Sequence, residues 1–294
     1  MNTEEVKTLI KETAARVEQR LGELLPSEDT PPATIHKAMR YSIFAGGKRI
    51  RPLLCIEAAK ACGGSEEVAI NAACALEALH TYTLIHDDLP CMDDDDFRRG
   101  KPTNHKVYGE ATAVLAGDSL LTAAFGVLAQ AELSPEQIVR GVACLSQAAG
   151  PAGMAGGQIL DLLGEGKTLT YDEIVQIQNL KTGCMIEAAV RLGAIAAGST
   201  PEEEEAVAEY ARKIGLAFQI RDDVLDVLGD EAELGKPIGS DQENQKSTFV
   251  GLKGIEGCEA LIEELTEGAI ASLASYPGSE FLCELARMLA GRTK

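Results

Sequence analysis

Two clusters of aspartates are the part of this 294-residue sequence most suited to chemistry. One occupies residues 87–96 and reads DDLPCMDDDD, and the other occupies residues 222–226 and reads DDVLD. Each follows an apolar run of helix-forming residues, which a solvated acidic loop would not need. Asp222 and Asp226 are four residues apart and share a helix face. Two carboxylates about 4 Å apart repel by roughly 1 kcal/mol in water and about 4 kcal/mol at an effective dielectric of 20, so a cation between them would stabilise this arrangement.

The possible metal ligands in both clusters are carboxylate oxygens, which favour a hard cation, and Mg²⁺ is the first candidate. Water and substrate phosphates would complete the coordination of the ion. Neither cluster has the spacing of an EF-hand calcium loop. For one cluster alone a solvated acidic patch would be the better interpretation, but two clusters in the same setting favour metal sites. In an ideal helix Asp87 and Asp93 would lie about 240° apart around the axis. We therefore expect Pro90 to distort the backbone between them if both are to bind one ion.

Basic residues are scarce, since the chain carries 27 of them against 46 acidic residues, for a formal charge of −19. That balance excludes general affinity for nucleic acids or anionic membranes, which need a positive field. The basic residues concentrate at residues 48–51 (KRIR), after a glycine pair, and at residues 98–101 (RRGK), directly after the first aspartate cluster. Simple ion pairing is an alternative for either Arg98 or Arg99. Together with bound metal, however, such concentrated cations predict a clamp for a diphosphate.

A histidine precedes the first aspartate cluster on the same predicted helix. His80 lies seven residues before Asp87 and hence on the same helix face. A satisfied core histidine and a histidine of the anion site are about equally consistent with that position.

Residues 76–105 (LEALHTYTLIHDDLPCMDDDDFRRGKPTNH) closely resemble the first aspartate-rich motif of bacterial short-chain trans-prenyl diphosphate synthases, in the polyprenyl synthetase family. Residues 218–227 (FQIRDDVLDV) resemble the second motif. Supporting matches occur in order along the chain, at residues 47–52 (GKRIRP), 156–161 (GGQILD), 181–183 (KTG), 235–236 (GK) and 246–248 (KST). Together the matches extend from about residue 36 to residue 250, so the resemblance is specific.

The resemblance implies an all-α fold, with residues 1–294 forming a single-domain helical bundle around a deep central cavity, the isoprenoid synthase fold. It implies that the two aspartate motifs face each other across the mouth of the cavity and bind three Mg²⁺ ions. The implied metal ligands are Asp87, Asp93 and Asp222, with Asp88, Asp223 and Asp226 close by. The implied contacts of the allylic diphosphate are Arg98, Lys181, Lys236 and Lys246. The implied isopentenyl diphosphate site consists of Lys48, Arg51, His80 and Arg99, and the residues that line the reacting carbons are Thr182 and Gln219.

The implied reaction joins isopentenyl diphosphate head to tail with dimethylallyl diphosphate and then with geranyl diphosphate, giving farnesyl diphosphate. Metal and cations neutralise the departing diphosphate, so the allylic C–O bond ionises, the alkene attacks the resulting cation, and a proton is lost. The residues expected to act in catalysis are Asp87, Asp222, Lys181, Thr182 and Gln219. Both aspartate motifs are intact, which argues against the alternative of a non-catalytic regulatory subunit of a prenyl synthase.

Product length depends on a single aromatic residue in this interpretation. In the family a bulky side chain about one turn before the first motif closes the cavity floor, and here Tyr82 stands at that place with Thr83 beside it. This pattern resembles bacterial farnesyl diphosphate synthases, with geranylgeranyl and geranyl diphosphate synthases as alternatives. Ordinary core packing of Tyr82 is a further alternative. Phe97 departs from the leucine that relatives more often carry.

The elements that position these residues are predicted to be helices throughout. The chain is rich in Ala, Leu, Glu and Lys, apolar residues recur at helical spacing from Val6 to Leu21, and runs typical of strands are scarce. Residues 66–88 predict a buried central helix, because several of its faces are apolar. Further helices are expected from about residue 34 towards the glycine pair at residues 46–47, and at residues 110–130, 135–150, 154–164, 171–197, 202–229, 256–274 and 279–290.

Cysteine usage and the N-terminus bear on location and assembly. The eight cysteines are scattered without a CxxC pair, which indicates reduced thiols in a cytoplasmic protein rather than disulfides or a zinc site. The N-terminus lacks the pattern of a signal peptide, and no uninterrupted run of 18 apolar residues predicts a membrane span. The resemblance implies a homodimer, for which the apolar helix expected at residues 110–130 is a candidate interface.

Overall fold

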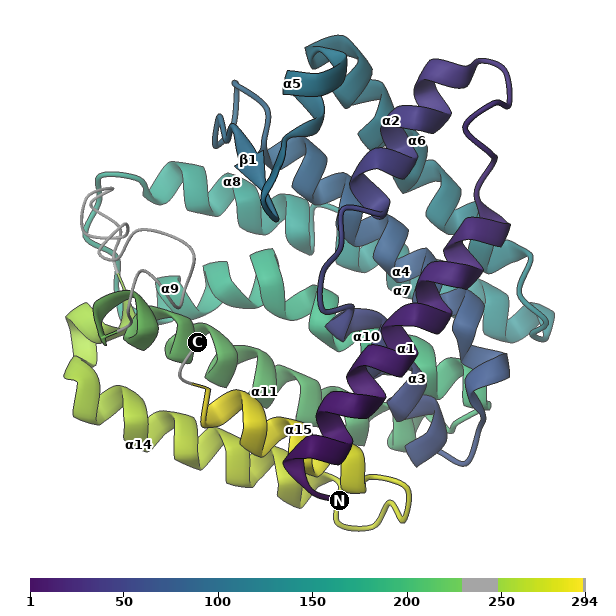
Figure 1. Ribbon diagram of the computed structural model, residues 1–294. Helices are drawn as coiled ribbons and strands as arrows, with labels where there is room; N and C mark the ends of the chain where they lie inside the picture. Colours follow the sequence, from purple (N-terminus) through teal and green to yellow (C-terminus); the bar gives the residue numbers. More distant parts are fainter. Residues whose placement is uncertain (229–247, 293–294) are drawn as a thin grey trace.

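The computed structural model describes residues 1–228 and 248–292 of the chain, and these residues form a bundle of helices (Figure 1). The described helices are α1 (Thr3–Leu24), α2 (Ala33–Ile43), α3 (Ile50–Ala61), α4 (Glu66–Asp87), α5 (Asn104–Tyr108), α6 (Glu110–Ala129), α7 (Pro135–Ala149), α8 (Met154–Gly164), α9 (Tyr171–Gln178), η1 (Asn179–Gly183), α10 (Cys184–Ala197), α11 (Pro201–Leu228), α14 (Phe249–Ser272) and α15 (Glu280–Ala290). Within these ranges the strands are β1 (Phe97–Arg98) and β2 (Lys101–Pro102), which pair antiparallel. The all-α fold is confirmed.

Local sequence signals begin several of the helices. Asn2 and Glu5 form a capping box at the start of α1. At α7, Ser134 accepts a hydrogen bond from the amide of Gln137, and Pro135 occupies the first helical position, where its missing N–H has no cost. Such signals explain why the predicted and observed starts of α7 agree.

Several elements differ from the predictions: the short helix α5 was not expected, and α14 begins at Phe249, before the expected residue 256. α3 lies in a stretch where no helix was expected, because nearly every face of it is buried and no amphipathic stripe is visible in the sequence. The helix expected over residues 171–197 is instead α9, the single π-helical turn η1 and α10. The short hairpin β1–β2 was not predicted, because two-residue strands leave no alternating pattern.

The central helix α4 is the core of the bundle. It packs against α3, α6 and α10, and Ala72, Ala75, Leu76 and Leu79 along it are at most 1% exposed. In Figure 1, α11, α14 and α15 form a layer on one side of the bundle, and α2, α5 and α6 lie on the opposite side. The predicted burial of residues 66–88 is therefore confirmed, and the helix end at Asp87 is held in place by packing on three neighbours.

Helices α3 and α10 approach each other closely because of one glycine. A Cβ built on Gly193 of α10 would lie 2.0 Å from the carbonyl oxygen of Cys55 and 2.9 Å from the backbone nitrogen of Ala59 on α3. Only a residue without a side chain fits this backbone-to-backbone contact. The contact fixes α10, and with it η1, against the N-terminal half of the bundle.

Two of the described helices are long and apolar enough to cross a membrane by length and composition alone. They are α4, whose most apolar window is 78% buried inside the fold, and α6, whose window is 39% buried. The sequence predicted no membrane span because it lacks an uninterrupted run of 18 apolar residues, but these two helices pass the less strict test of length and average composition. For α4 the core position accounts for the composition, whereas α6 leaves Val114 and Leu115 exposed.

Candidate active site

The first aspartate cluster begins on the last residue of α4 and continues into a loop that folds back onto the helix end. The backbone N–H of Asp93 donates to the carbonyl oxygen of Asp87 at 2.8 Å, and that of Asp94 donates to the carbonyl oxygen of Leu89 at 3.2 Å. The distortion expected at Pro90 is thus present. Burial raises the pKa of Asp87 above its usual value, and the neighbouring charge of Asp93 raises it further.

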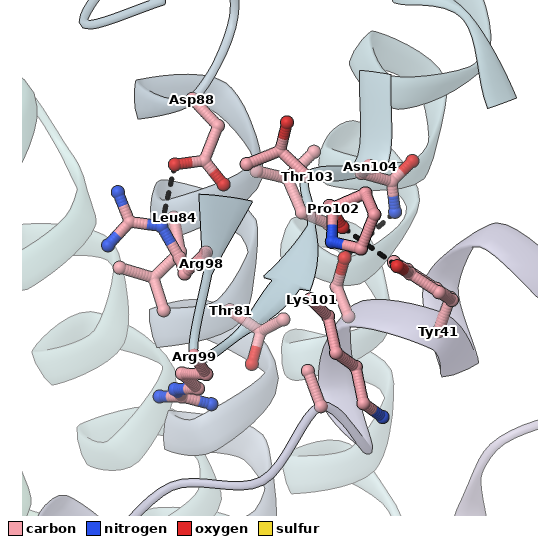
Figure 2. Close-up of a pocket in the computed structure, with 13 residues that line it drawn as sticks. Tyr41, Thr81, Leu84, Asp88, Arg98, Arg99, Lys101, Pro102, Thr103 and Asn104 are labelled. Carbon is pink, nitrogen blue, oxygen red and sulfur yellow. Dashed lines mark hydrogen bonds and ion pairs between the residues drawn. The ribbon is translucent and has the colours of Figure 1, made fainter. Parts of the chain in front are cut away.

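Asp87 and Asp88 contact different neighbours, because successive helical residues are rotated by about 100°. Asp87 accepts a hydrogen bond from Nε2 of Gln158 on α8. Asp88 is buried and accepts one from Nε of Arg98 at 2.6 Å, and Arg98 also donates to Asp95 at 3.1 Å (Figure 2). Burial raises the pKa of Asp88 to about 6, although the charge and hydrogen bond of Arg98 act in the opposite direction.

The hairpin β1–β2 carries two arginines past the end of α4 (Figure 2). Its turn requires left-handed backbone at Arg99 (φ 54°) and Gly100 (φ 74°). Nη1 of Arg99 donates to the carbonyl oxygen of Gly46, and the guanidinium lies against Gly47, where a Cβ would be 2.7 Å from Cζ. The glycine pair before residue 48 therefore provides the space that Arg99 occupies.

Several arginines surround His80. Nη1 of Arg51 lies 3.1 Å from Nε2 of His80, and since arginine only donates, this Nε2 is the acceptor. The pKa of His80 is held well below its usual range, first by burial and then by the charges of Arg51, Arg99, Arg49 and Arg98. Within the described residues, Nε of Arg51 is buried and has no hydrogen-bond partner. A buried donor without a partner suits a site that takes an anion.

The side chain of Arg49 faces the interior of the fold. Its side chain is fully buried, with Nη1 donating to Glu77 at 2.6 Å and Nη2 to Glu18 at 2.9 Å. Its φ of 49° places it in the left-handed region, at the start of α3. Arg49 therefore anchors the loop from inside, while Lys48 before it is exposed and Arg51 after it reaches His80.

The second aspartate cluster lies on α11 and faces a pocket formed with α8, α9 and η1. The site residues predicted from sequence that line it are Lys181, Thr182, Gln219, Asp222 and Asp223. Nζ of Lys181 donates to Oδ2 of Asp161 on α8 at 2.6 Å. The π-helical turn η1 thus presents the lysine and threonine of the KTG motif to the same pocket as the aspartates.

Further contacts hold the aspartates of α11. Oδ2 of Asp223 accepts the backbone N–H of Phe249 at 2.7 Å, and Asp226 is 3% exposed. Nη2 of Arg292, close to the end of the chain, donates to Oδ1 of Asp222, and the Arg292 guanidinium stacks 4.8 Å above the ring of Phe218. Arg292 therefore places a positive charge directly on the second cluster.

The two aspartate clusters lie near the same lysine, Lys181. Asp87 contacts Gln158, and Asp161, one turn further along α8, contacts Lys181. The charge of Lys181 acts on Asp87 and opposes the rise in its pKa, and Lys181 also lines the pocket that holds Asp222. Clusters 135 residues apart in sequence therefore both lie near Lys181.

The donor chemistry of this site fits Mg²⁺. Within residues 1–228 and 248–292, no three Asp, Glu, His or Cys side chains lie close enough together to hold a metal ion by themselves. Mg²⁺ does not need such a cage, because one or two carboxylates, water and phosphate oxygens complete its coordination. Burial of Asp87 beside the charge of Asp93 is a penalty that a bound cation would relieve.

Two predicted residues lie outside the described part of the chain, namely Lys236 and Lys246. The two chain-length residues lie on α4, where Tyr82 and Thr83 are each 7% exposed and the Thr83 hydroxyl donates to the carbonyl oxygen of His80 at 2.8 Å. Both residues lie on the helix that ends at the first aspartate cluster, as the sequence predicted. Their role in product length stays a prediction.

Sequence reasoning assigned no role to three residues that contact the site. Gln158 and Asp161 belong to the GGQILD match, so the motif carried a signal for them. Arg292 had none, because it is a lone arginine 70 residues from its partner Asp222.

Comparison with known proteins identifies close relatives. The sequence model of the family named Polyprenyl synthetase matches residues 32–272. A farnesyl diphosphate synthase of Geobacillus stearothermophilus is 45% identical, over 95% of this chain and 96% of its own length. Geranylgeranyl pyrophosphate synthase 9 of Arabidopsis thaliana chloroplasts is 48% identical, over 85% of this chain and 71% of its own. Among solved structures, an FPP/GFPP synthase of Zymomonas mobilis has a TM-score of 0.87 at 34% identity, covering 98% of this chain and 99% of its own.

Proposed function

The chain belongs to the polyprenyl synthetase family, and on that premise we propose that it is a farnesyl diphosphate synthase. It condenses isopentenyl diphosphate with dimethylallyl diphosphate and then with geranyl diphosphate. The observation that carries this function is that Lys181 lines the pocket of Asp222 and Asp223 while its charge also acts on Asp87, with a group of arginines around His80 on the same helix as Asp87. One region of the molecule then offers carboxylates for metal and cations for two diphosphates.

The carboxylates are the metal-binding part of the proposal. Three Mg²⁺ ions would be held by Asp87, Asp93 and Asp222, with Asp88, Asp223 and Asp226 close by. When bound, Mg²⁺ neutralises the diphosphate as it leaves the allylic carbon. The chain's own contribution is to hold these oxygens in place, through Gln158 on one side and α11 on the other.

The allylic diphosphate would be bound by cations that already stand beside the carboxylates. Arg98 lies between Asp88 and Asp95, and Lys181 lies on Asp161. Lys236 and Lys246 complete the proposed set from outside the described residues. Arginine offers a planar fork to phosphate oxygens and lysine a compact charge, so together they orient the leaving group.

Isopentenyl diphosphate would be bound by Lys48, Arg51, His80 and Arg99. The partnerless Nε of Arg51 supports an anion there. Because burial, and after it the charges of the neighbouring arginines, hold the pKa of His80 low, His80 is neutral, and it accepts from Arg51 instead of adding charge. This leaves the guanidinium groups to face the phosphate.

Catalysis then consists of holding the two substrates close together and excluding water. Thr182 and Gln219, in the pocket of the second cluster, would line the reacting carbons. The allylic C–O bond breaks to release diphosphate, and the alkene carbon of isopentenyl diphosphate bonds to the allylic cation. The released diphosphate then takes a proton from the condensed cation, which restores a double bond. The buried Ala and Leu side chains of α4 support a dry wall for the cation.

Product length would be set by Tyr82 with Thr83. Geranylgeranyl diphosphate is the second candidate product, because a geranylgeranyl pyrophosphate synthase is 48% identical to this chain. We propose one domain over residues 1–294 and a homodimer, in which the exposed Val114 and Leu115 of α6 would be covered.

Turnover of isopentenyl diphosphate with dimethylallyl diphosphate, with and without Mg²⁺, tests the proposal. Chromatography of the products should give mainly the fifteen-carbon diphosphate, and chelation should abolish it. Asp87→Ala or Asp222→Ala should reduce turnover by several orders of magnitude with unchanged helicity. Near-normal activity in either variant would refute the role of the clusters, and a twenty-carbon product would favour the second candidate.

A further inference from the structure

His86 occupies a special place between the aspartate cluster and the aromatic floor residue. It is the residue of α4 directly before Asp87, and it lies one helical turn after Tyr82. Its imidazole crosses to α6, where Nε2 lies 3.1 Å from the carbonyl oxygen of Val114. Since a carbonyl oxygen only accepts, Nε2 carries the proton and donates. The ring is thereby tied to the backbone of a different helix.

A glycine on α6 provides the space for this ring. A Cβ built on Gly117 would lie 2.2 Å from Nε2 and 2.5 Å from Cδ2 of His86, well inside van der Waals contact. The imidazole therefore lies directly on the α6 backbone. Gly126, further along the same helix, has nothing within 4 Å of its Cβ position. Gly117 and Gly126 therefore lie on the same helix, and of these two only Gly117 lies against the imidazole.

The imidazole also contacts the ring of Tyr82. The two ring centroids are 5.7 Å apart and the planes meet at 84°, an edge-to-face arrangement of the kind that aromatic pairs favour. Tyr82 is 7% exposed, so little open space lies around it. His86 thus stands between the α6 backbone on one side and the Tyr82 ring on the other.

We infer that His86, placed by Gly117 and the Val114 carbonyl, is a positioning residue that holds the Tyr82 ring and so determines product length. The inference rests on the proposed function, in which Tyr82 closes the cavity floor. Without the imidazole the Tyr82 ring can move into the vacated volume, which deepens the cavity. If a larger residue at position 117 displaces the imidazole from α6, the imidazole pushes the Tyr82 ring in the opposite direction, which makes the cavity shallower. The two perturbations should shift product length in opposite directions.

The test compares product ratios of purified full-length variants at equal conversion. His86→Ala should raise the ratio of twenty-carbon to fifteen-carbon product by about 2- to 10-fold, the range that one edge-to-face aromatic contact can contribute. His86→Gln keeps an amide donor for Val114 but lacks the ring, and should shift the ratio in the same direction. Gly117→Ala should raise the share of the ten-carbon product. Gly126→Ala is the matched control and should leave the ratios unchanged.

Tyr82→Ala separates this inference from the function on which it rests. If Tyr82→Ala lengthens the product while His86→Ala, His86→Gln and Gly117→Ala leave the ratios as in the parent protein, His86 has no positioning role and the proposed function stands. If Tyr82→Ala also leaves the length unchanged, the floor lies elsewhere and the inference falls with it. If the parent protein forms no condensation product, the proposed function itself is wrong. A change in rate without a change in ratio also counts against the inference.

Discussion

Replacing Glu77 by leucine should sharply destabilise the protein, because Glu77 balances a charge that has no access to water. The Arg49 side chain is fully buried, the Glu77 side chain is 2% exposed, and their charged atoms are 2.6 Å apart. In the variant, the guanidinium stays in the interior, and Glu18, which is 40% exposed, is the carboxylate that still contacts it. The structure therefore predicts a buried charge with a weaker counterion.

The magnitude follows from the behaviour of buried ion pairs. Removing one partner typically costs about 3–5 kcal/mol, and because Glu18 retains part of the attraction we expect the lower end, about 3 kcal/mol. For a chain of this size that corresponds to a fall of roughly 6 °C in the melting temperature. The double variant Arg49→Met with Glu77→Leu should recover most of the loss, since apolar replacements of a whole buried pair are often neutral.

Urea denaturation of the single and double variants, in the presence of a chelator, measures these effects. Glu4→Gln is the control, because the Glu4–Lys7 pair is 81% and 55% exposed and should contribute nothing measurable. The reasoning would be refuted if Glu77→Leu were as mild as Glu4→Gln, or if the double variant lost the sum of both single changes. Since Arg49 precedes the first turn of α3, which carries Arg51, Glu77→Leu should raise the KM for isopentenyl diphosphate more than that for the allylic substrate.

Three further predictions concern the site and its frame. Burial raises the pKa of Asp88 from 3.8 to about 6, so the folded protein holds this proton more tightly than the unfolded chain does. The stability of the metal-free protein therefore falls as the pH rises between these two values. Asp88→Asn should remove up to about 3 kcal/mol of that fall, as measured by thermal unfolding. Arg292→Ala should tighten Mg²⁺ binding in calorimetry while lowering stability in chelator, because Arg292 competes for Asp222; unchanged affinity would contradict this. Gly193→Ala should destabilise by about 1–3 kcal/mol in denaturant through contact with Cys55, whereas stabilisation by helix propensity would show that the helices separate freely.

The helices and the aspartate motifs were accessible to sequence reasoning because their signals are local. Periodicity located α1, a long run of helix formers that is apolar on several faces located the central α4, and residue type alone marked the carboxylates at residues 87–96 and 222–226. α3 was missed because a helix buried on nearly all sides has no amphipathic pattern, and η1 because a single π turn inside a helical stretch leaves no mark in composition.

Partners of the site residues were not accessible, because they depend on tertiary contacts. Helical geometry predicts that Asp87 and Asp88 diverge, but not that one meets Gln158 on α8 and the other Arg98 on the hairpin. Nor does a run of three basic residues reveal that Arg49 faces inward. Its direction follows from a left-handed φ and from Glu77, 28 residues away.

The ion pairs of the site explain how a chain with a formal charge of −19 can bind two diphosphates. Two of the proposed binding cations already lie on carboxylates, Arg98 on Asp88 and Lys181 on Asp161, and Arg292 likewise lies on Asp222. Diphosphate can draw such a cation away only if something else neutralises the carboxylate, because a half-buried charge left alone is costly. Mg²⁺ is suited to take that place. Metal and diphosphate should therefore each raise the affinity for the other by the same factor, as linkage requires.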